Sequence, residues 1–324
     1  MKKLFPIVLT SVLLVSVFLP NAYGQTEVEQ LLTGNVNDAS ALAKAYLDPL
    51  AESFGTSLNN GWYNSAKPHK LVGFDITFTI PVTLTPSSTR KFDVSKMNLE
   101  YWELKDNSQY MSPTVTGEKS GGVSLVDKAT GSNELQLPQG ANLQFVPAPI
   151  VQVGVGLPFH TEIIGRFFPK VEVSDIGNFS MWGIGIKNEF KEFIPVFKAL
   201  PFSMSVLLGY SNFSSSFDIN SSQHKELTFK ANGFTGKLLI SKSIPVLTVY
   251  AGVGFNKSKT NVDVKGTYDF SGVSVTDPIS LEFKNNGVNA NIGLRIKLAV
   301  LAFHFDYAFG KYSVANAGVG INFR

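Results

Sequence analysis

The feature of this sequence that most constrains its fold is a two-residue alternation of apolar and polar side chains, in a chain without long apolar runs. After residue 24 the longest uninterrupted apolar stretch is Leu298–Phe303, which has six residues. A helix needs about 20 apolar residues to cross a bilayer. Because only helices and closed barrels satisfy every backbone polar group in lipid, a membrane-spanning form of this chain must be a barrel.

The alternation is clearest between residues 288 and 298, where every second residue is apolar. A tilted membrane strand needs about 9–11 residues, so this stretch is long enough to cross. Residues 301–309 repeat the pattern, and a two-residue turn at Ala299-Val300 would pair 298 with 301, 296 with 303 and 294 with 305. All three pairs are apolar, so turn length and face assignment agree. Further alternating segments are 74–84, 151–157, 159–167, 182–186, 202–210, 247–255 and 315–323.

The composition favours a membrane barrel over a soluble β-sandwich, which also alternates. Charged residues make up 16% of the chain, against about 25% in soluble domains. A sandwich typically carries Lys, Glu and Thr on its exposed face, whereas this chain carries mostly Gly, Asn, Ser and Thr there. We expect an all-β protein: a transmembrane antiparallel β-barrel of about 12 strands, within a range of about 10–14, with an N-terminal helical segment.

Loop lengths predict the orientation of the barrel. If the C-terminus is periplasmic, the turns at Ala299-Val300 and Ser241–Pro245 lie in the periplasm. The long polar stretches Lys257–Gly287, Ser214–Lys230 and Pro169–Asn178 are then external loops. Short periplasmic turns and long external loops are typical of outer-membrane barrels.

Residues 1–24 are expected to be a signal peptide. Lys2 and Lys3 precede an apolar stretch, and Ala22-Tyr23-Gly24 predicts a cut after Gly24. An uncleaved anchor is disfavoured because the apolar run is short and contains Pro6. The leader and the barrel pattern together predict the cell outer membrane as the location. Loss of the two lysines lowers the net charge from +3 to +1, which gives no reason to expect nucleic-acid binding.

Two segments depart from the two-residue pattern. Residues 25–72 are predicted to be a helical plug or a periplasmic collar, and Asp48-Pro49 can begin a second helix there. Residues 73–324 form the predicted barrel, with a polar, loop-rich insertion at 85–144 that holds long loops, a hatch or two more strands. The helical prediction rests on apolar residues at every fourth position: Leu42, Tyr46, Leu50, Phe54 and Leu58.

Several short motifs stand out along the mature chain. They are Tyr46-Leu47-Asp48-Pro49, Gly61-Trp62-Tyr63, Gly73-Phe74-Asp75, Leu137-Pro138-Gln139-Gly140, Gly156-Leu157-Pro158-Phe159-His160-Thr161-Glu162 and Arg166-Phe167-Phe168-Pro169. Together they resemble an uncharacterised family of Gram-negative outer-membrane β-barrel proteins, which implies a barrel without an established activity. The chain is more loosely similar to long-chain fatty-acid and aromatic-hydrocarbon outer-membrane transporters, which carry an N-terminal plug. The last strand resembles the insertion signal of such barrels, except that Arg324 follows the aromatic Phe323.

Six polar side chains are predicted to face the lumen. Arg295 lies opposite His304 and diagonal to Asp306 across the predicted turn, within reach of a charge-assisted pair. Glu162 and Arg166 are roughly 13 Å apart along a strand, so each needs partners on neighbouring strands. An ion-pair network, a solute-selective constriction and a hydrolase site all remain open as interpretations. The six are His160, Glu162, Arg166, Arg295, His304 and Asp306.

Catalytic chemistry is not expected. The chain has no cysteine and no Gly-x-Ser-x-Gly motif, so no activated nucleophile stands out. His160-Thr161-Glu162 lacks the further ligands that a zinc site needs. We predict no catalytic residue, no metal site and no cofactor, and the protein is not expected to be an enzyme.

The leading functional prediction is a channel or transporter for small solutes, hydrophobic ones included. The alternative is a non-conducting structural or surface-binding outer-membrane barrel that acts through its external loops, above all Lys257–Gly287. Expected partners are outer-membrane lipid, a small hydrophobic solute, and the barrel assembly machinery and periplasmic chaperones during insertion. No nucleic acid is expected among them.

Overall fold

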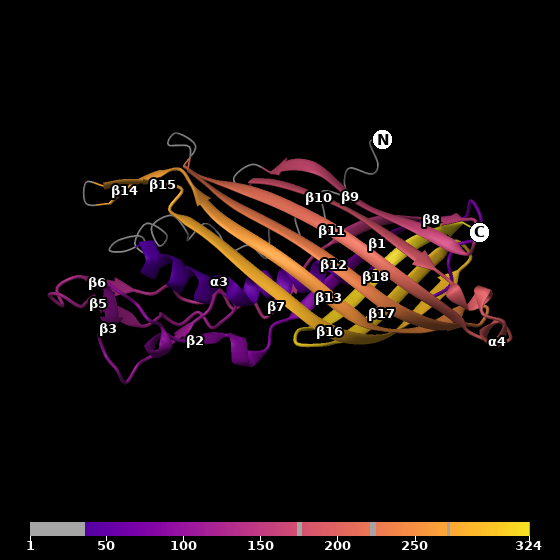
Figure 1. Cartoon of the computed structure of the whole chain (residues 1–324), viewed down its shortest axis with the longest axis horizontal. Coiled ribbons are helices and arrows are strands. Elements are labelled where there is room, and N and C mark those ends of the chain that lie inside the picture. The colour runs from indigo at the N-terminus through magenta and orange to yellow at the C-terminus, as the bar shows by residue number, and fades with distance from the viewer. Residues whose placement is uncertain (1–35, 174–176, 221–224, 271–272, 324) are drawn as a thin grey trace.

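The main sheet of the computed structural model closes into an antiparallel barrel, because β18 pairs along its length with β1 (Figure 1). The structure describes residues 36–173, 177–220, 225–270 and 273–323, so the predicted signal peptide lies outside the described residues. The ten strands of the closed ring are β1 (Phe74–Leu84), β8 (Ile150–Leu157), β9 (Thr161–Val173), β10 (Gly177–Asn188), β11 (Ser203–Asn220), β12 (Lys225–Ser243), β13 (Leu247–Lys265), β16 (Ile279–Leu298), β17 (Leu301–Phe309) and β18 (Ser313–Phe323).

The predicted all-β barrel is confirmed, with a strand number at the lower end of the expected range. The expected value of about 12 is too high, because the insertion at 85–144 adds no strand to the closed ring. An eleventh strand, β7 (Phe145–Pro147), joins the sheet only at the end of β1. The register predicted across Ala299-Val300 is confirmed, since Leu298 pairs with Leu301 and Leu294 with Phe305.

Four neighbouring strands are much longer than a membrane crossing requires. β11, β12, β13 and β16 contain 18, 19, 19 and 20 residues, whereas about 9–11 residues are sufficient. Their additional length extends beyond one mouth of the barrel (Figure 1). We call residues 211–220, 225–233, 256–265 and 279–287 the protruding half, and the remaining barrel strands the membrane half.

The two faces of the sheet exchange their character at the border between these halves. On β13 the outward side chains change from the apolar Phe255 to Lys257, and then remain polar. The inward side chains change from Thr260 to the buried apolar Val262 and Val264. β16 changes in the same way between residues 286 and 288. The membrane half therefore has an apolar outside, and the protruding half has an apolar inside.

This exchange corrects the prediction that Lys257–Gly287, Ser214–Lys230 and Pro169–Asn178 are external loops. All three stretches consist largely of paired strand. They still alternate, but their apolar residues face inward. The outward apolar pattern that predicts a membrane strand therefore stops before these strands end. Between β13 and β16 the chain forms a small hairpin from β14 (Thr267–Phe270) and β15 (Val273–Thr276).

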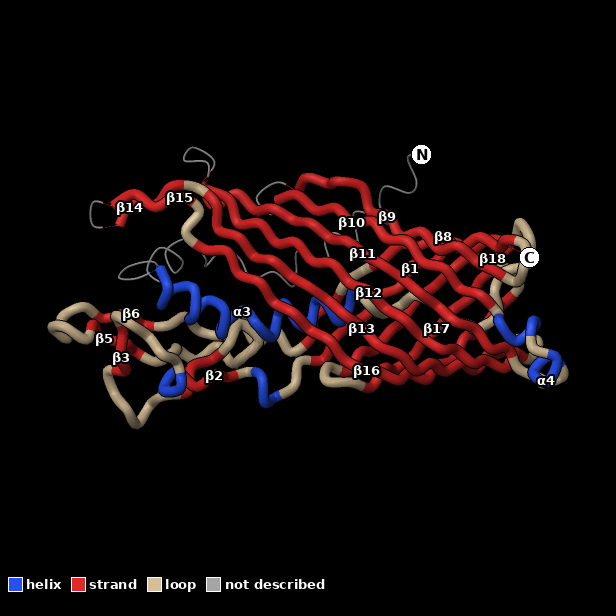
Figure 2. Tube along the Cα trace, in the orientation of Figure 1, coloured by secondary structure: helices blue, strands red, loops and turns tan. Residues whose placement is uncertain are grey.

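The long helix α3 (Val36–Leu58) covers the inner face of the protruding half (Figure 2). Pro49 lies inside this helix, so the predicted second helix beginning at Pro49 does not form. Packing on both sides compensates for the backbone hydrogen bond that a proline removes. The cluster between α3 and the strands contains Ala39, Ala43, Ala51, Val262, Val264, Tyr268, Ile279, Leu281 and Phe283.

The insertion packs against the opposite side of α3, and its core includes Leu42 and Trp102. The carboxylate of Asp38 ties the two together by accepting hydrogen bonds from the backbone N–H groups of residues 100–102. Two small sheets build the insertion, together with 3-10 turns at Ser87–Thr89 and Val94–Lys96. Their strands are β2 (Lys91–Asp93), β3 (Trp102–Leu104), β4 (Met111–Pro113), β5 (Ser124–Asp127) and β6 (Glu134–Gln136).

The two mouths of the barrel differ. One mouth, the short-turn end, holds the end of β18, the turn at Ala299-Val300, a 3-10 turn (Phe190–Phe193) and α4 (Pro195–Lys198) (Figure 2). The long-strand end holds α3, the insertion and the β14–β15 hairpin. No helix within the described ranges is long and apolar enough to cross a membrane.

Candidate functional site in the barrel lumen

The lumen is occupied by the chain's own backbone. α3 ends at Leu58 near the long-strand end, and β1 begins at Phe74, which pairs with Phe323 at the short-turn end. Residues 59–72, which we call the luminal segment, therefore run the length of the membrane half. At the short-turn end of this segment, the backbone N–H of Val72 donates to the carbonyl of Gly156 on β8.

Arg166 on β9 binds the first residues of the luminal segment, directly after α3. Its guanidinium donates to the carbonyl oxygens of Leu58 at 2.8 Å and Asn60 at 2.7 Å. The same group lies 3.5 Å from the ring centre of Trp62, a cation–π contact. Arg166 is 1% exposed, and a buried guanidinium needs such partners to offset its lost hydration.

Two strand glycines make room for the Trp62 ring. A Cβ atom at Gly209 would lie 2.7 Å from Trp62 Cε2, and one at Gly185 would lie 2.8 Å from Cζ3. These are closer than real Cβ contacts, so the small inward face of β10 and β11 matches the shape of the indole. The luminal segment is thus packed against the barrel wall.

A second polar group surrounds Asp306 on β17. Its carboxylate accepts hydrogen bonds from Tyr250 at 2.9 Å, Asn291 at 3.1 Å and Asn316 at 2.9 Å. Tyr63 of the luminal segment donates to the other amide atom of Asn291, its Oδ1. The network therefore connects the segment to β13, β16, β17 and β18.

Near the short-turn end, backbone groups of the luminal segment are also paired. The N–H of Ala66 donates to Ser241 Oγ at 3.1 Å, and Ser205 Oγ donates to the carbonyl of the same residue. Lys187 Nζ reaches the carbonyl of Ser65 at 3.4 Å. Three adjacent strands, β10, β11 and β12, thus hold this part of the segment.

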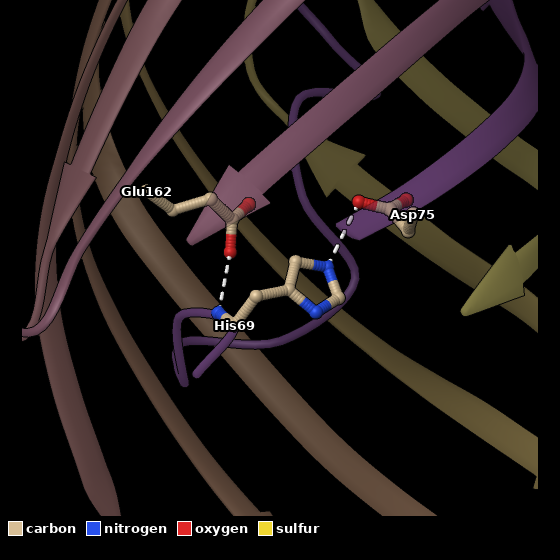
Figure 3. A group of neighbouring side chains, drawn as sticks. All are labelled: His69, Asp75 and Glu162. Carbon is tan, nitrogen blue, oxygen red and sulfur yellow. Dashed lines mark hydrogen bonds and ion pairs between the residues drawn. The ribbon is translucent and has the colours of Figure 1, made fainter. Parts of the chain in front are cut away.

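His69, Asp75 and Glu162 converge beneath these contacts (Figure 3). His69 Nε2 lies 2.9 Å from Asp75 Oδ1, and the backbone N–H of His69 donates to Glu162 Oε2 at 2.9 Å. The remaining Glu162 oxygen pairs with the ammonium of Lys187 at 3.1 Å. Three potential ligand atoms lie within 4.8 Å of one another, which is the residue set of a metal site.

The chemistry of this cluster does not favour a metal ion. Both oxygens of Glu162 already accept hydrogen bonds, and Lys187, its partner, is buried. A divalent ion bound to Glu162 would face that ammonium at close range. The two carboxylates instead balance neighbouring cations and anchor the turn before β1.

A cavity of about 230 Å³ opens beside this cluster at the short-turn end. We call it the basal cavity. Trp62 and Tyr63 of the luminal segment are among its lining residues. Its charged lining comprises five cationic and two anionic side chains: Lys67, Lys70, Lys187, Arg295, Lys297, Asp75 and Glu162.

The structure places five of the six predicted lumen residues on inward positions. Glu162 and Arg166 are buried and bind neighbouring strands or the luminal segment. His160 departs from the prediction: it lies exposed in the turn before β9 with a φ of 53°, and its ring contacts Phe193. The predicted strand 159–167 begins two residues too early, because Phe159 and His160 belong to that turn.

The remaining three residues, Arg295, His304 and Asp306, each have different side-chain partners. Arg295 does pair in register with His304, as predicted. Its guanidinium donates to Asn322 at 2.6 Å, and no ion pair joins it to Asp306 in the part of the chain that the structure describes. His304 Nε2 lies 3.2 Å from Thr79 Oγ1. The expected Arg295–Asp306 pair is therefore replaced by amide and hydroxyl partners.

Sequence reasoning missed the contribution of the luminal segment. Asp75 and Lys187 could have been found, because both lie on the small or polar face of an alternating strand. His69 and Trp62 lie in an irregular segment, where no periodicity indicates which side chains point at the wall. Their positions depend on partners distant in sequence.

Comparison with known protein families identifies one family that matches this chain. A model of the family of unknown function DUF6588 matches residues 1–323. No curated protein matches the chain.

Three solved structures resemble the fold at low identity. The translocator domain of the autotransporter NalP from Neisseria meningitidis is 11% identical, with a TM-score of 0.33, over 79% of this chain and 90% of that one. Ail of Yersinia pestis is 8% identical, with a TM-score of 0.28, over 78% and 97%. The toluene transporter TodX of Pseudomonas putida is 9% identical, with a TM-score of 0.23, over 77% and 89%.

The barrel is established by the chain's own strand pairing. The family match covers nearly every residue and confirms the predicted resemblance to an uncharacterised family. The chain belongs to the family of unknown function DUF6588.

Proposed function

We propose that this protein is a non-conducting outer-membrane barrel that anchors a folded binding domain at the cell surface. The domain consists of α3, the insertion and the protruding half. This is the alternative to a channel that the sequence left open. The proposal assigns no enzymatic step to the protein and needs no transported solute.

The observation that carries this proposal is the filled lumen. Arg166 alone makes two charge-assisted hydrogen bonds to the luminal segment, and such bonds contribute about 1.5–3 kcal/mol each. Opening the lumen would also separate Trp62 from its fitted wall and Tyr63 from Asn291. Because the segment continues directly into α3 and β1, it cannot leave without disturbing both.

The proposed orientation follows from the two mouths. Outer-membrane barrels typically keep short turns in the periplasm and extended structure outside. The turn at Ala299-Val300 and the end of β18 then lie in the periplasm. The large apolar cores around α3 support a rigid external domain.

Conductance with a reversible lock tests closure. Ser65 Oγ and Ser241 Oγ lie 3.4 Å apart, and the chain has no cysteine, so Ser65→Cys/Ser241→Cys can tie the luminal segment to β12 by one disulfide. We expect negligible planar-bilayer conductance from wild type, from the locked variant and from the reduced variant. The control is Ser65→Cys alone. Steady conductance that the lock abolishes and reductant restores would contradict the proposal.

That opposite result would establish the second candidate, a gated channel. The basal cavity favours it, because about 230 Å³ of the lumen is already open from the short-turn end. A solute would then enter beside Lys297 and move past Trp62 once the segment shifts.

The orientation has its own test. An epitope inserted at Gly131, in the exposed loop between β5 and β6, should be labelled by antibody on intact cells. The matched control places the same epitope at Pro245, in the turn between β12 and β13, where labelling should require permeabilised cells. The reverse pattern would place the domain in the periplasm.

A further inference from the structure

Four lysines gather on the outer surface of the protruding half, just beyond the apolar band. We call them the lysine patch: Lys230, Lys257, Lys259 and Lys284. They lie on the adjacent strands β12, β13 and β16 and are exposed or half-exposed. Glu282 lies among them, so the five side chains carry a net charge of +3 (4 − 1).

The register of the strands concentrates this charge. Lys259 lies directly opposite Lys284 in the β13–β16 pair, and like charges in that arrangement destabilise a sheet. Glu282 bridges them: it pairs with Lys284 Nζ at 2.5 Å and with Lys259 Nζ through its other oxygen. The hydrogen bonds from Lys259 and Lys284 lower the pKa of Glu282 to about 2.

One carboxylate cannot neutralise the whole patch. Lys230 and Lys257 are exposed, and within the described ranges neither forms an ion pair with a carboxylate. The two side chains project beside the Lys259–Glu282–Lys284 group because their strands are hydrogen-bonded neighbours. The patch therefore keeps two ammonium groups without a carboxylate partner, Lys230 and Lys257, beside a group of net charge +1, and an external anion would stabilise this arrangement.

The height of the patch indicates which anion is available. Phe234, Phe255 and Val288 are the last exposed apolar side chains on the three strands. Lys257 follows Phe255 by two residues and Lys284 precedes Val288 by four, so they lie about 7 and 13 Å further along their strands. With a strand tilt of about 40° these become roughly 5 and 10 Å above the hydrocarbon edge, where lipid headgroups lie.

We propose that the lysine patch binds the phosphate groups of membrane lipids surrounding the barrel at its long-strand end. Ammonium groups on flexible stems can each donate several charge-assisted hydrogen bonds to phosphate oxygens. Bound phosphates would neutralise the remaining positive charge of the patch and fix the height of the barrel in the membrane. The patch is separate from the lumen, so this inference does not depend on whether the barrel conducts, but the choice of lipid A as the lipid rests on the proposed external position of the long-strand end.

Lipid binding to the purified full-length protein in a neutral detergent tests the inference. The probe is lipid A that retains its phosphates, and the midpoint of thermal unfolding reports binding. The variant Lys230→Gln/Lys257→Gln/Lys284→Gln should bind about a hundredfold more weakly. Lys259 is retained so that Glu282 keeps a partner and the sheet remains folded.

Two matched variants separate phosphate binding from a loss of stability. Lys91→Gln/Lys119→Gln/Lys198→Gln removes the same charge from exposed positions elsewhere and should bind as wild type does. Glu282→Gln makes the patch more positive and should bind about fivefold more tightly. A merely structural role for the lysines predicts no tightening by Glu282→Gln, and that result would overturn the inference.

Two further probes identify the source of the phosphate. Lipid A stripped of its phosphates should stabilise wild type and the patch variant equally, and more weakly than intact lipid A stabilises wild type. Inorganic phosphate at the same concentration should have no effect. Equal binding of both lipids would exclude phosphate recognition, and equal stabilisation by inorganic phosphate would exclude the lipid.

Discussion

The membrane half and the protruding half of this barrel are built from the same continuous strands, yet they are opposite in design. β16 presents Leu294 outward in the membrane half and buries Leu281 inward in the protruding half. The change occurs within two residues, without a break in the hydrogen-bond ladder. What surrounds a strand, lipid or water, thus decides which face must be apolar.

The interiors differ in the same sense. The lumen of the membrane half holds Arg166, Asp306 and Lys187, each of which has hydrogen-bond or ion-pair partners on other strands or on the luminal segment. The interior of the protruding half is an apolar core against α3. The first interior is specified by polar geometry, and the second by the exclusion of water. Mutations of the same type should therefore have different consequences in the two halves.

The largest difference should come from placing an arginine on each apolar face. Leu281→Arg buries a charge against α3 and should cost more than about 3 kcal/mol. We expect the domain of α3 and the insertion to become sensitive to protease, while the barrel retains its heat-modifiable gel mobility. Leu294→Arg places the charge in lipid, at about 2–4 kcal/mol near the midplane, and should lower the yield of inserted barrel. If both variants show the same defect, either protease sensitivity or a low yield of inserted barrel, the proposed difference in surroundings between the two halves is wrong.

Paired arginine substitutions in the lumen should show a smaller difference. Arg166→Met leaves the carbonyls of Leu58 and Asn60 without their donor and should lower the free energy of unfolding by about 3 kcal/mol. Arg295→Met loses one bond to Asn322 near the open basal cavity and should cost about 1 kcal/mol. Urea unfolding measures both. Equal losses would show that the luminal segment is not held by Arg166.

The contrast between the halves also explains how far the sequence could be interpreted. The register of β16 and β17 could be predicted from alternation, because over the paired residues 290–298 and 301–309 one face is always toward lipid and the other always toward the lumen. The continuation of β13 beyond Phe255 was not predicted. Its outward residues from Lys257 onward are polar, and a polar outward face is not expected for a strand that lies in lipid. The partners of Arg166 could not be predicted for a different reason: they are backbone carbonyls 106 and 108 residues away in the sequence, and a side-chain pattern does not indicate them.

Glycine positions give a finer comparison between the two sides of one wall. Gly209→Ala would push a methyl group into the Trp62 ring, and overpacking of this kind costs about 1–3 kcal/mol. Gly165→Ala adds the same methyl group on the outward face of β9, where nothing lies within 4 Å. We expect that substitution to leave the urea midpoint unchanged. A comparable loss from both would indicate a general effect of glycine in these strands, without specific packing of Trp62.

Acid should loosen the insertion before the barrel, and this is the smallest effect we expect. Backbone hydrogen bonds from Asn133 and Thr130 lower the pKa of Asp127 in the insertion to about 2. Its contribution to stability is therefore complete above about pH 4 and is lost as the pH falls towards 2.

The pKa values of Asp106 and Glu134 are lowered as well, through hydrogen bonds from Ser108 and Lys105, so they should add to this loss. Limited proteolysis of the insertion by an acid-active protease, between pH 5 and pH 2.5 (about the range of these titrations), measures it. Asp127→Asn should be more readily cleaved at pH 5 and should show a smaller further increase on acidification, because its part of the titration is gone. An unchanged pH profile would mean that Asp127 does not hold the β5–β6 loop, whereas acid loss of heat-modifiable mobility would place the sensitive groups in the membrane half.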